Sequence, residues 1–467
     1  MPADTAHASH PKISLKLGTS AKLPNCDMCI KAVNLAVRAL AAAVVLPMVL
    51  RGGVAVAAHD YFVIRVTDEQ TGRGVPLVEL KLSNDVSYWT DSAGIAALEE
   101  PSLEGQDVFL QIRSHGYESA IETPLGQGVV VKVERGARRE LQVRRTMIAE
   151  RLYRLTGEGI YRDSVLAGMP APMKEPLLNG KVLGQDTASA AIYRGKLFWI
   201  WGDTIGPAYW NFHVAGATSD LSDDPAVAVN YCYFTDDIGR AKEMLPSKKK
   251  GLVWIEGLIP MKDPAGRERL IATYTRQDGL KFPDECGLAL FDDELQQFKP
   301  WKELPCRKGH VSSHPFLHQG YWYLYPDLCV PNDWEAIQDP KRWEQRKVKL
   351  PADAGRPSCI VWNEYRQRWL LFSENFGDVF YAEAQQPEGP YGDAVKIVHH
   401  DNYNFYNVVT HSFFNQDGGR TIYFEGTYTD AFSAAKVKTP RYNYNQIMYR
   451  LRLDDPRLEP AQKQQNE

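Results

Sequence analysis

The chain has few of the features that mark nucleic-acid-binding or membrane-spanning proteins. Its 467 residues carry a formal net charge of −4, and its one dense basic run is "SKKKG" at 247–251. Proteins that bind the phosphate backbone of nucleic acid typically carry a stripe of basic residues, and this sequence has none. The apolar run "ALAAAVVLPMVL" at 39–50 is shorter than the ~20 residues of a membrane-spanning helix. We therefore expect neither nucleic acid nor, in the mature protein, a membrane as a partner.

The same apolar run fits the core of a signal peptide. It follows a basic lead, "MCIKAVNLAVR", and precedes small residues, "AVAA" at 55–58, which are typical of a cleavage site. We expect cleavage after Ala57 or Ala58 and a secreted or periplasmic protein. The residues before Met28 are interpreted as an over-extended gene start or a long leader.

Cysteine is scarce, with seven in the chain. Cleavage would remove Cys26 and Cys29 and leave five, so at least one would stay unpaired. Cys286 and Cys306 bracket two predicted strands, and they are candidates for one disulfide in an exported protein. No CxxC motif remains and the histidines are scattered, so the sequence predicts no metal site and no cofactor.

What the sequence does contain is period-two alternation between residues 60 and 145. Bursts such as "YFVIRVTD" and "PLVELKLS" are separated by turn signals such as "TGRG", which indicates an all-β sandwich. The order "VTDEQTGRGVPLVELKL", "YWTDSAGIAAL", "VFLQIRSHGYES" resembles the carboxypeptidase regulatory-like, or transthyretin-like, sandwich. The resemblance implies an attachment, spacer or interaction module.

A linker with a short helix is predicted over 146–178. Ile148, Leu152 and Leu155 have helical spacing, and the segment ends in a stretch rich in proline and methionine.

From about residue 179 a longer pattern repeats: an apolar strand, a polar or glycine-containing turn and an aromatic strand. Five segments share it, starting near 190, 258, 314, 358 and 411. Radial repetition of four-stranded sheets, with repeats of ~40 to 50 residues, is typical of a β-propeller, and we predict five blades. The predicted all-β chain therefore comprises a leader and signal peptide (1–58), a β-sandwich (59–145), a linker with a short helix (146–178), a five-bladed β-propeller (179–455) and a disordered tail (456–467).

The stretch "GQDTASAAIYRGKLFWIWGDT" at 184–204 carries an aspartate near each end. If Arg194 and Gly195 form a two-residue turn, Asp186 lies opposite Asp203. Like charges on facing residues destabilise a hairpin, but a reaction that needs two carboxyl groups in different protonation states benefits from them. The structural alternative is that "GDT" ends a strand in a turn and that Asp186 caps a loop.

Other polar residues fall at or just before the predicted first strands. First strands line a propeller axis, so these positions are expected to converge: Asp186, Glu256, His314, Arg356 and His411. Aromatic and amide groups near the same strand ends form a plausible sugar-binding surface: Trp210, Asn211, His213 and Tyr406. Each histidine alone fits a satisfied structural histidine equally well, and three further acids, Glu374, Glu425 and Asp327, end second strands.

The 184–204 segment resembles the five-bladed propeller proteins long catalogued as a domain of unknown function, which include endo-D-arabinanases. In that family an aspartate precedes the first inner strand and a "GDT" ends the second. The resemblance implies a glycoside hydrolase-like propeller with Asp186 and Asp203 as the catalytic carboxylates. Related propeller glycosidases use an Asp base, a second Asp and a Glu acid, which adds Glu256. This chain departs from the pattern after "GDT", where it continues "IGPAYWNFH".

The expected function is an exported glycoside hydrolase that cleaves an arabinan-like or other furanose-containing polysaccharide. Asp186 is assigned as base and Asp203 as acid, with Glu256 as a competing acid, because a glycosidase needs one protonated and one ionised carboxyl group. Two alternatives remain. One is a non-catalytic carbohydrate- or protein-binding propeller. The other is a propeller enzyme whose axial acids hold calcium, which a histidine-rich ring suits poorly.

Overall fold

The computed structural model describes residues 60–119, 121–124, 126–208, 214–306, 314–325 and 327–463. Strands dominate this part of the chain, and its single α-helix, α1 (Arg162–Leu166), is five residues long. The prediction of a mostly β protein is therefore confirmed. Among these residues we find no helix of the length and apolarity needed to cross a membrane. The predicted leader lies outside the described residues.

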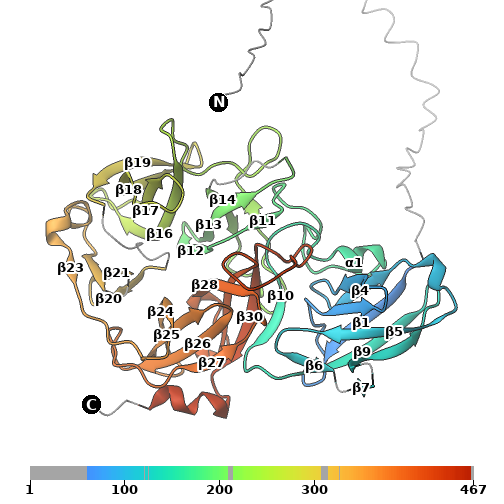
Figure 1. Ribbon diagram of the computed structural model, residues 1–467. Helices are drawn as coiled ribbons and strands as arrows, with labels where there is room; N and C mark the ends of the chain where they lie inside the picture. Colours follow the sequence, from blue (N-terminus) through green and yellow to red (C-terminus); the bar gives the residue numbers. More distant parts are fainter. Residues whose placement is uncertain are drawn as a thin grey trace, which may run out of the picture. The chain divides into compact units, whose positions relative to one another are not determined.

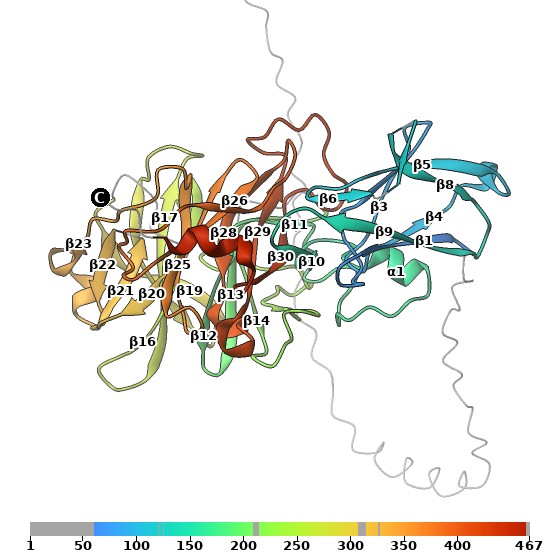
Figure 2. The same cartoon turned by 90° about the horizontal axis from the view of Figure 1, so that it is seen from below.

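The N-terminal region folds into two sheets that bury alternate side chains in a common hydrophobic core. Figure 2 shows β1, β4 and β9 of one sheet and β5 and β8 of the other as two layers. One N-terminal sheet, in spatial order, comprises β4 (Ile95–Leu98), β1 (Phe62–Asp68), β9 (Arg138–Arg145) and β6 (Tyr117–Ser119). The other comprises β3 (Ser87–Trp89), β2 (Glu79–Leu82), β5 (Asp107–Arg113), β8 (Gly126–Lys132) and β7 (Glu122–Thr123).

Five antiparallel sheets follow, and from here on they are called the first to the fifth sheet in chain order. The strands of the first four are close in sequence. Figure 1 shows them one after another in chain order. The first two comprise β11 (Gly184–Gln185), β12 (Ser189–Tyr193), β13 (Lys196–Ile205), β14 (Val214–Ser219) and β15 (Cys232–Tyr233), and then β16 (Leu252–Lys262), β17 (Glu268–Gln277), β18 (Glu285–Asp292) and β19 (Gln297–Leu304). The third and fourth comprise β20 (Phe316–His318), β21 (Tyr321–Tyr325), β22 (Leu328–Pro331) and β23 (Glu344–Gln345), and then β24 (Arg356–Asn363), β25 (Arg368–Asn375), β26 (Asp378–Ala384) and β27 (Val395–Val398).

The fifth sheet joins distant parts of the chain. Its strands are β28 (Asn404–Thr410), β29 (Thr421–Thr429), β30 (Asn445–Arg452) and, beside β30, β10 (Glu150–Arg154). The helix predicted from the spacing of Ile148, Leu152 and Leu155 is therefore wrong, and the helix of this segment is α1. The reason is that β10 is buried along its whole length, so it shows no period-two alternation, and its buried Arg151 donates to the Pro76 and His115 carbonyls.

The predicted disordered tail is also wrong over most of its length. Residues Pro456–Gln462 form a 3₁₀-helix, η6, whose N-terminus is capped by Asp455, which accepts from the Arg457 amide. Leu458 and Ala461 lie three residues apart and are fully buried in the main hydrophobic core. Burial of these two side chains holds the segment in place.

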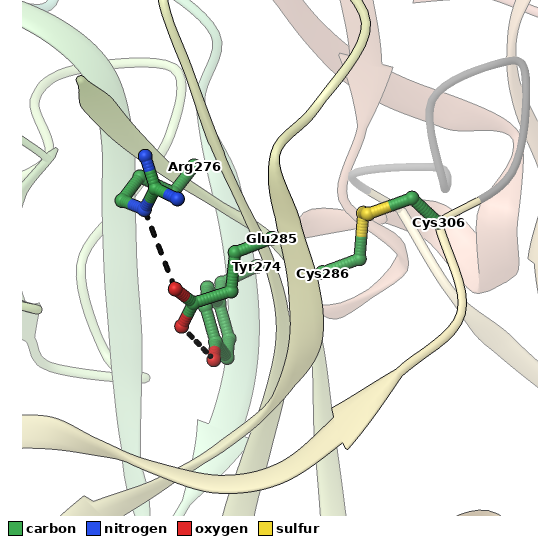
Figure 3. Close-up of a disulfide and its surroundings, with 5 residues drawn as sticks. All are labelled: Tyr274, Arg276, Glu285, Cys286 and Cys306. Atoms are coloured by element: carbon green, nitrogen blue, oxygen red, sulfur yellow. Dashed lines mark hydrogen bonds and ion pairs between the residues drawn. A yellow bond between two sulfur atoms is a disulfide. The ribbon is translucent and has the colours of Figure 1, made fainter. Parts of the chain in front are cut away.

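The predicted disulfide between Cys286 and Cys306 is confirmed (Figure 3). It ties the start of β18 to the residues that follow β19, across 20 residues of sequence. Beside it, Glu285 accepts from the Tyr274 hydroxyl and from Arg276, as Figure 3 shows. Such a crosslink stabilises this edge of the second sheet mainly by restricting the unfolded chain.

Candidate active site

The hairpin that carries both aspartates has the register expected from its turn. Arg194 and Gly195 both have positive φ, at 49° and 74°, as a two-residue hairpin turn requires. Tyr193 pairs with Lys196, and at the far end of the hairpin Gly184 pairs with Ile205. The same register holds on both sides of a break between β11 and β12. It places Asp186 opposite Asp203.

Asp186 sits in that break and folds over the neighbouring strand. Its amide donates to the Asp203 carbonyl at 3.2 Å, and its Oδ1 accepts from the Asp203 amide at 2.8 Å. The carboxylate thereby lies against Gly202, where an added Cβ would come within 2.3 Å of Oδ1. Close approach of a carboxylate to the backbone thus explains the glycine of "GDT".

Neutral donors from other sheets hold the two carboxylates. The Tyr406 hydroxyl on β28 donates to Asp186 Oδ2 at 2.6 Å, and the Trp254 indole on β16 donates to Asp203 Oδ1 at 2.8 Å. The Tyr444 hydroxyl, from the residue before β30, hydrogen-bonds to both carboxylates. All five side chains are partly exposed. Three sheets therefore converge on the acid pair, by which we mean Asp186 and Asp203.

Burial of the acid pair favours its protonated form. Loss of water, followed by the charge of Asp203, raises the pKa of Asp186 to about 7, against the hydrogen bonds from Tyr406, Tyr444 and the Asp203 amide. Loss of water also raises the pKa of Asp203, although Trp254 and Tyr444 oppose it. Because two interacting carboxyl groups titrate as a unit, the pair holds a proton at pH values where an isolated aspartate has lost it.

A chain of hydrogen bonds links the acid pair to the fourth sheet. Asn407 donates to Thr187 Oγ1 at 2.6 Å and accepts from Arg356 Nη2 at 2.9 Å. Arg356 in turn pairs with the buried Glu374; burial raises the pKa of this carboxyl above its usual value, although the guanidinium opposes the rise. Arg356 thus reaches Thr187, the neighbour of Asp186, only through Asn407, and Glu374 compensates its charge.

The backbone is strained where these groups meet. Thr187, Asn407 and Tyr444 have positive φ values of 51°, 51° and 64°. Asparagine tolerates this conformation, whereas a β-branched threonine is a true outlier there. The Thr187 amide is held by Thr427 Oγ1 at 3.0 Å. Strain of this kind gathers at functional sites, where the surroundings must enforce it.

Glu256 lies on the same face of β16 as a residue that contacts the acid pair. It follows Trp254 by two residues, so both side chains emerge on one face of the strand, and the Trp254 indole donates to Asp203. A β-bulge follows Glu256 at Gly257, which has a φ of 61°. The role predicted for Glu256 stays a prediction.

His411 does not occupy the predicted position. The first strand of the fifth sheet is β28, so His411 follows its end, and Tyr406 and Asn407 lie in the middle of the strand. His411 is buried, pairs with Glu425 through a 2.8 Å contact and packs edge-on against Trp199. The prediction failed because the "HSFF" segment was aligned as a first strand.

The remaining predicted residues divide into two groups. His314 precedes β20 as expected, and burial, followed by the charge of His411, lowers its pKa well below the usual range. Trp210, Asn211 and His213 lie outside the described residues. Among the described residues, no cluster of three or more histidine, cysteine or acidic side chains could hold a metal ion.

Sequence reasoning missed Tyr444 and Trp254. Trp254 could have been found from its i, i+2 relation to Glu256. Tyr444 carries no local signal, because it reaches the acids only through the packing of β30 against the first sheet, where its carbonyl accepts from the Gln185 amide.

No protein-family model and no curated protein matches the chain. Several solved structures resemble it weakly. A family 43 glycoside hydrolase, the YxiA protein from Bacillus licheniformis, is 13% identical over 57% of this chain and 71% of its own, with a TM-score of 0.37. A family 117 glycoside hydrolase from Zobellia galactanivorans is 13% identical over 66% and 93%, with a TM-score of 0.36. An endo-1,5-alpha-L-arabinanase from Thermotoga petrophila is 11% identical over 56% and 70%, with a TM-score of 0.36.

Proposed function

We propose that the five sheets are the blades of a five-bladed β-propeller and that the two N-terminal sheets form a β-sandwich. The antiparallel order of each sheet supports the blades, as does the completion of the fifth sheet by β10, which comes from the opposite end of this region (Figure 1). Hydrogen bonds that link Asn407, in the middle of β28, to Arg356 at the start of β24 and to Thr187 between β11 and β12 support a common axis. The buried side chains of the two N-terminal sheets belong to one hydrophobic cluster, which supports the sandwich.

The chemistry that this arrangement supports best is hydrolysis of a glycosidic bond. The carrying observation is the acid pair, two facing carboxyl groups that are partly exposed and of which Asp186 has a pKa raised to about 7 by burial and by the charge of Asp203. A glycosidase needs one protonated carboxyl group for the leaving oxygen and one carboxylate that activates water or attacks carbon. Polysaccharide is the proposed substrate class, and arabinan-like or other furanose-containing chains are the first to test.

The hydrogen bonds support a division of roles within the pair. Both oxygens of Asp186 accept hydrogen bonds, from the Asp203 amide and from Tyr406, and such bonds favour the ionised form. Asp203 accepts from fewer donors, the Trp254 indole and the Tyr444 hydroxyl. Because burial raises the pKa of Asp186 to about 7, the proton of the free protein belongs to the coupled pair and not to one assigned residue. Asp186 remains the proposed base and Asp203 the proposed acid, with Glu256 as the competing acid on the adjacent strand.

The test is release of reducing sugars from arabinan, levan and xylan. Asp186→Asn and Asp203→Asn should each abolish release, and Glu256→Gln should do so only if it is the proton donor. Asp293→Asn is the matched control, because Asp293 pairs with Arg194 at the opposite end of the same hairpin. Full activity in either acid-pair variant would refute the proposal, and glycan binding without turnover in the wild type would favour a binding propeller.

Export is proposed on the signal-like N-terminus, and the disulfide supports it because such bonds persist in oxidising compartments. Cell fractionation with mass spectrometry of the N-terminus tests this. A mature chain that begins near Ala58 outside the cytoplasm is expected, and a full-length cytoplasmic chain would refute it.

A further inference from the structure

Two phenylalanines are exposed on loops where the fold gains nothing from them. Phe376, between β25 and β26, is 74% exposed, and Phe432, between β29 and β30, is 70% exposed. Both have left-handed backbones, with φ of 46° and 58°. A bulky residue at positive φ is strained, and an aromatic ring in water forgoes the stabilisation of burial. Each position therefore carries two costs.

The β25–β26 turn shows how readily the strain could be avoided. Asn375 pairs with Asp378, so Phe376 and Gly377 are the two central residues of a tight hairpin turn, and both have positive φ. Asn-Gly is the preferred pair for such a turn. Retention of phenylalanine at an exposed, strained position indicates a role outside the fold.

The two loops are anchored on one short segment, residues 400–404. The Gly377 carbonyl accepts from the His400 amide at 3.1 Å, and an added Cβ on Gly377 would lie 2.1 Å from the Tyr403 carbonyl oxygen. The Ala431 carbonyl, next to Phe432, accepts from Asn404 Nδ2 at 3.1 Å. The two phenylalanines therefore flank the same few residues.

That segment leads directly to the acid pair. Asn404 begins β28 and lies two residues, or about 7 Å of strand, from Tyr406. The Tyr406 hydroxyl donates to Asp186. Asp401 and Asn402, within the segment that anchors both loops, are exposed. Aromatic rings beside exposed amide and carboxylate groups can contact the C–H face of a sugar and its hydroxyl groups together.

We propose that Phe376 and Phe432 form an aromatic platform that holds the sugar rings of an extended polysaccharide beside the acid pair. The inference rests on the proposed function and deepens it, because a platform outside the reacting residues implies that several sugar units bind and that the chain is cut internally. A glycan is favoured over other occupants because the platform is continuous, through Tyr406, with carboxylates suited to glycoside chemistry.

Binding is measured with full-length Asp203→Asn protein, which should bind without turnover. Affinity for soluble arabinan, levan and xylan is compared with that of the same protein carrying Phe376→Asn and Phe432→Asn. Asparagine suits positive φ, so the double change should raise the thermal midpoint while it weakens binding about tenfold or more. Phe282→Asn is the matched control, since Phe282 is 58% exposed on the β17–β18 loop and has no left-handed backbone.

Three outcomes would overturn the platform: unchanged affinity in the double variant, an equal loss in the Phe282 control, or no binding of any of the three glycans. Binding to phosphatidylglycerol vesicles that needs both phenylalanines would assign them to a membrane surface and would also overturn it.

Kinetic measurements distinguish failure of the aromatic platform from failure of the proposed glycoside hydrolysis. In the otherwise wild-type chain, the double change should raise the KM for polysaccharide and leave kcat/KM for a short aryl glycoside unchanged. If the acid-pair variants stay active while the platform variants lose binding, the proposed function fails and the platform stands. If the acid-pair variants are inactive and the platform variants bind normally, only the platform fails.

Discussion

Two pairs of ionisable side chains lie where the first and fifth sheets meet, and they are built in opposite ways. His411 and Glu425 are buried, opposite in nature and packed against Trp199. Asp186 and Asp203 are alike, partly exposed and held only by neutral donors. An arrangement selected for stability compensates its charges, whereas the acid pair keeps a repulsion that one proton relieves. The difference supports our proposal that the acid pair is the functional one.

The largest effect should come from the acid pair itself. Asp203→Asn should lower kcat by about 10² to 10⁴-fold, the usual contribution of a positioned acid or base. Its thermal midpoint should stay level or rise, because a like-charge contact is removed. Steady-state kinetics with thermal denaturation checks both, and a large loss of stability would mean that the acids are structural after all.

The pH dependence of folding stability should differ between wild type and Asp186→Asn, because the pKa of Asp186 is raised in the folded protein. A carboxyl group protonated more readily in the folded state stabilises the fold below its unfolded pKa near 4, and that contribution is lost as pH rises to about 7. Wild type should lose stability over this interval, and Asp186→Asn should lose less. Denaturant titrations at successive pH values test this, and parallel curves would contradict it.

Breaking the His411–Glu425 contact should lower stability and not catalysis. Glu425→Ala leaves the buried His411 Nε2 without this partner and should cost about 1–3 kcal/mol of folding free energy, as expected for a buried polar group that loses its hydrogen bond. Any loss of activity should follow the unfolded fraction. Urea denaturation together with activity per folded molecule distinguishes this from a catalytic role, which would lower activity in fully folded protein.

Gly202→Ala should disturb the acid pair without removing either acid. The new methyl group would meet Asp186 Oδ1, and misplacement of a reacting group by about 1 Å can cost 10²-fold in rate. Gly195→Ala is the comparison: it adds a methyl group at the turn of the same hairpin, where nothing lies within 4 Å of an added Cβ, and it strains a left-handed backbone with φ of 74°, so it shows whether destabilising the hairpin alone lowers activity. Equal activity in the two variants would show that the Asp186 position does not matter.

The smallest effect is expected from Tyr444→Phe. Loss of the hydroxyl removes a hydrogen bond that lowers the pKa of both acids, so the alkaline limb of the activity profile should move upward. The rate at the optimum should fall only a fewfold, in keeping with one neutral hydrogen bond of about 1 kcal/mol. An unchanged pH profile would separate Tyr444 from the titration of the pair.

The parts of the site that local chemistry determines could be predicted from sequence. The Arg194–Gly195 turn and period-two pairing sufficed to place Asp186 opposite Asp203. Tyr444 could not be predicted, because it immediately precedes β30, more than 200 residues from the acid pair in sequence. His411 was misplaced when a 3₁₀ turn, Ser412–Phe414, was taken for a strand. The β10 strand was mistaken for a helix because burial on both faces removes the alternation that marks strands.

Closure of the fifth sheet by β10 makes assembly of the acid pair a late event in biosynthesis. Both aspartates are synthesised by residue 203, but Tyr406, Tyr444 and the β30 partner of β10 come some 200 to 250 residues later. A nascent chain interrupted before Tyr444 would contain the two acids without the hydroxyl that hydrogen-bonds to both of them. Only a chain translated through Arg452 carries all the donors around the acid pair together with the strand that pairs with β10.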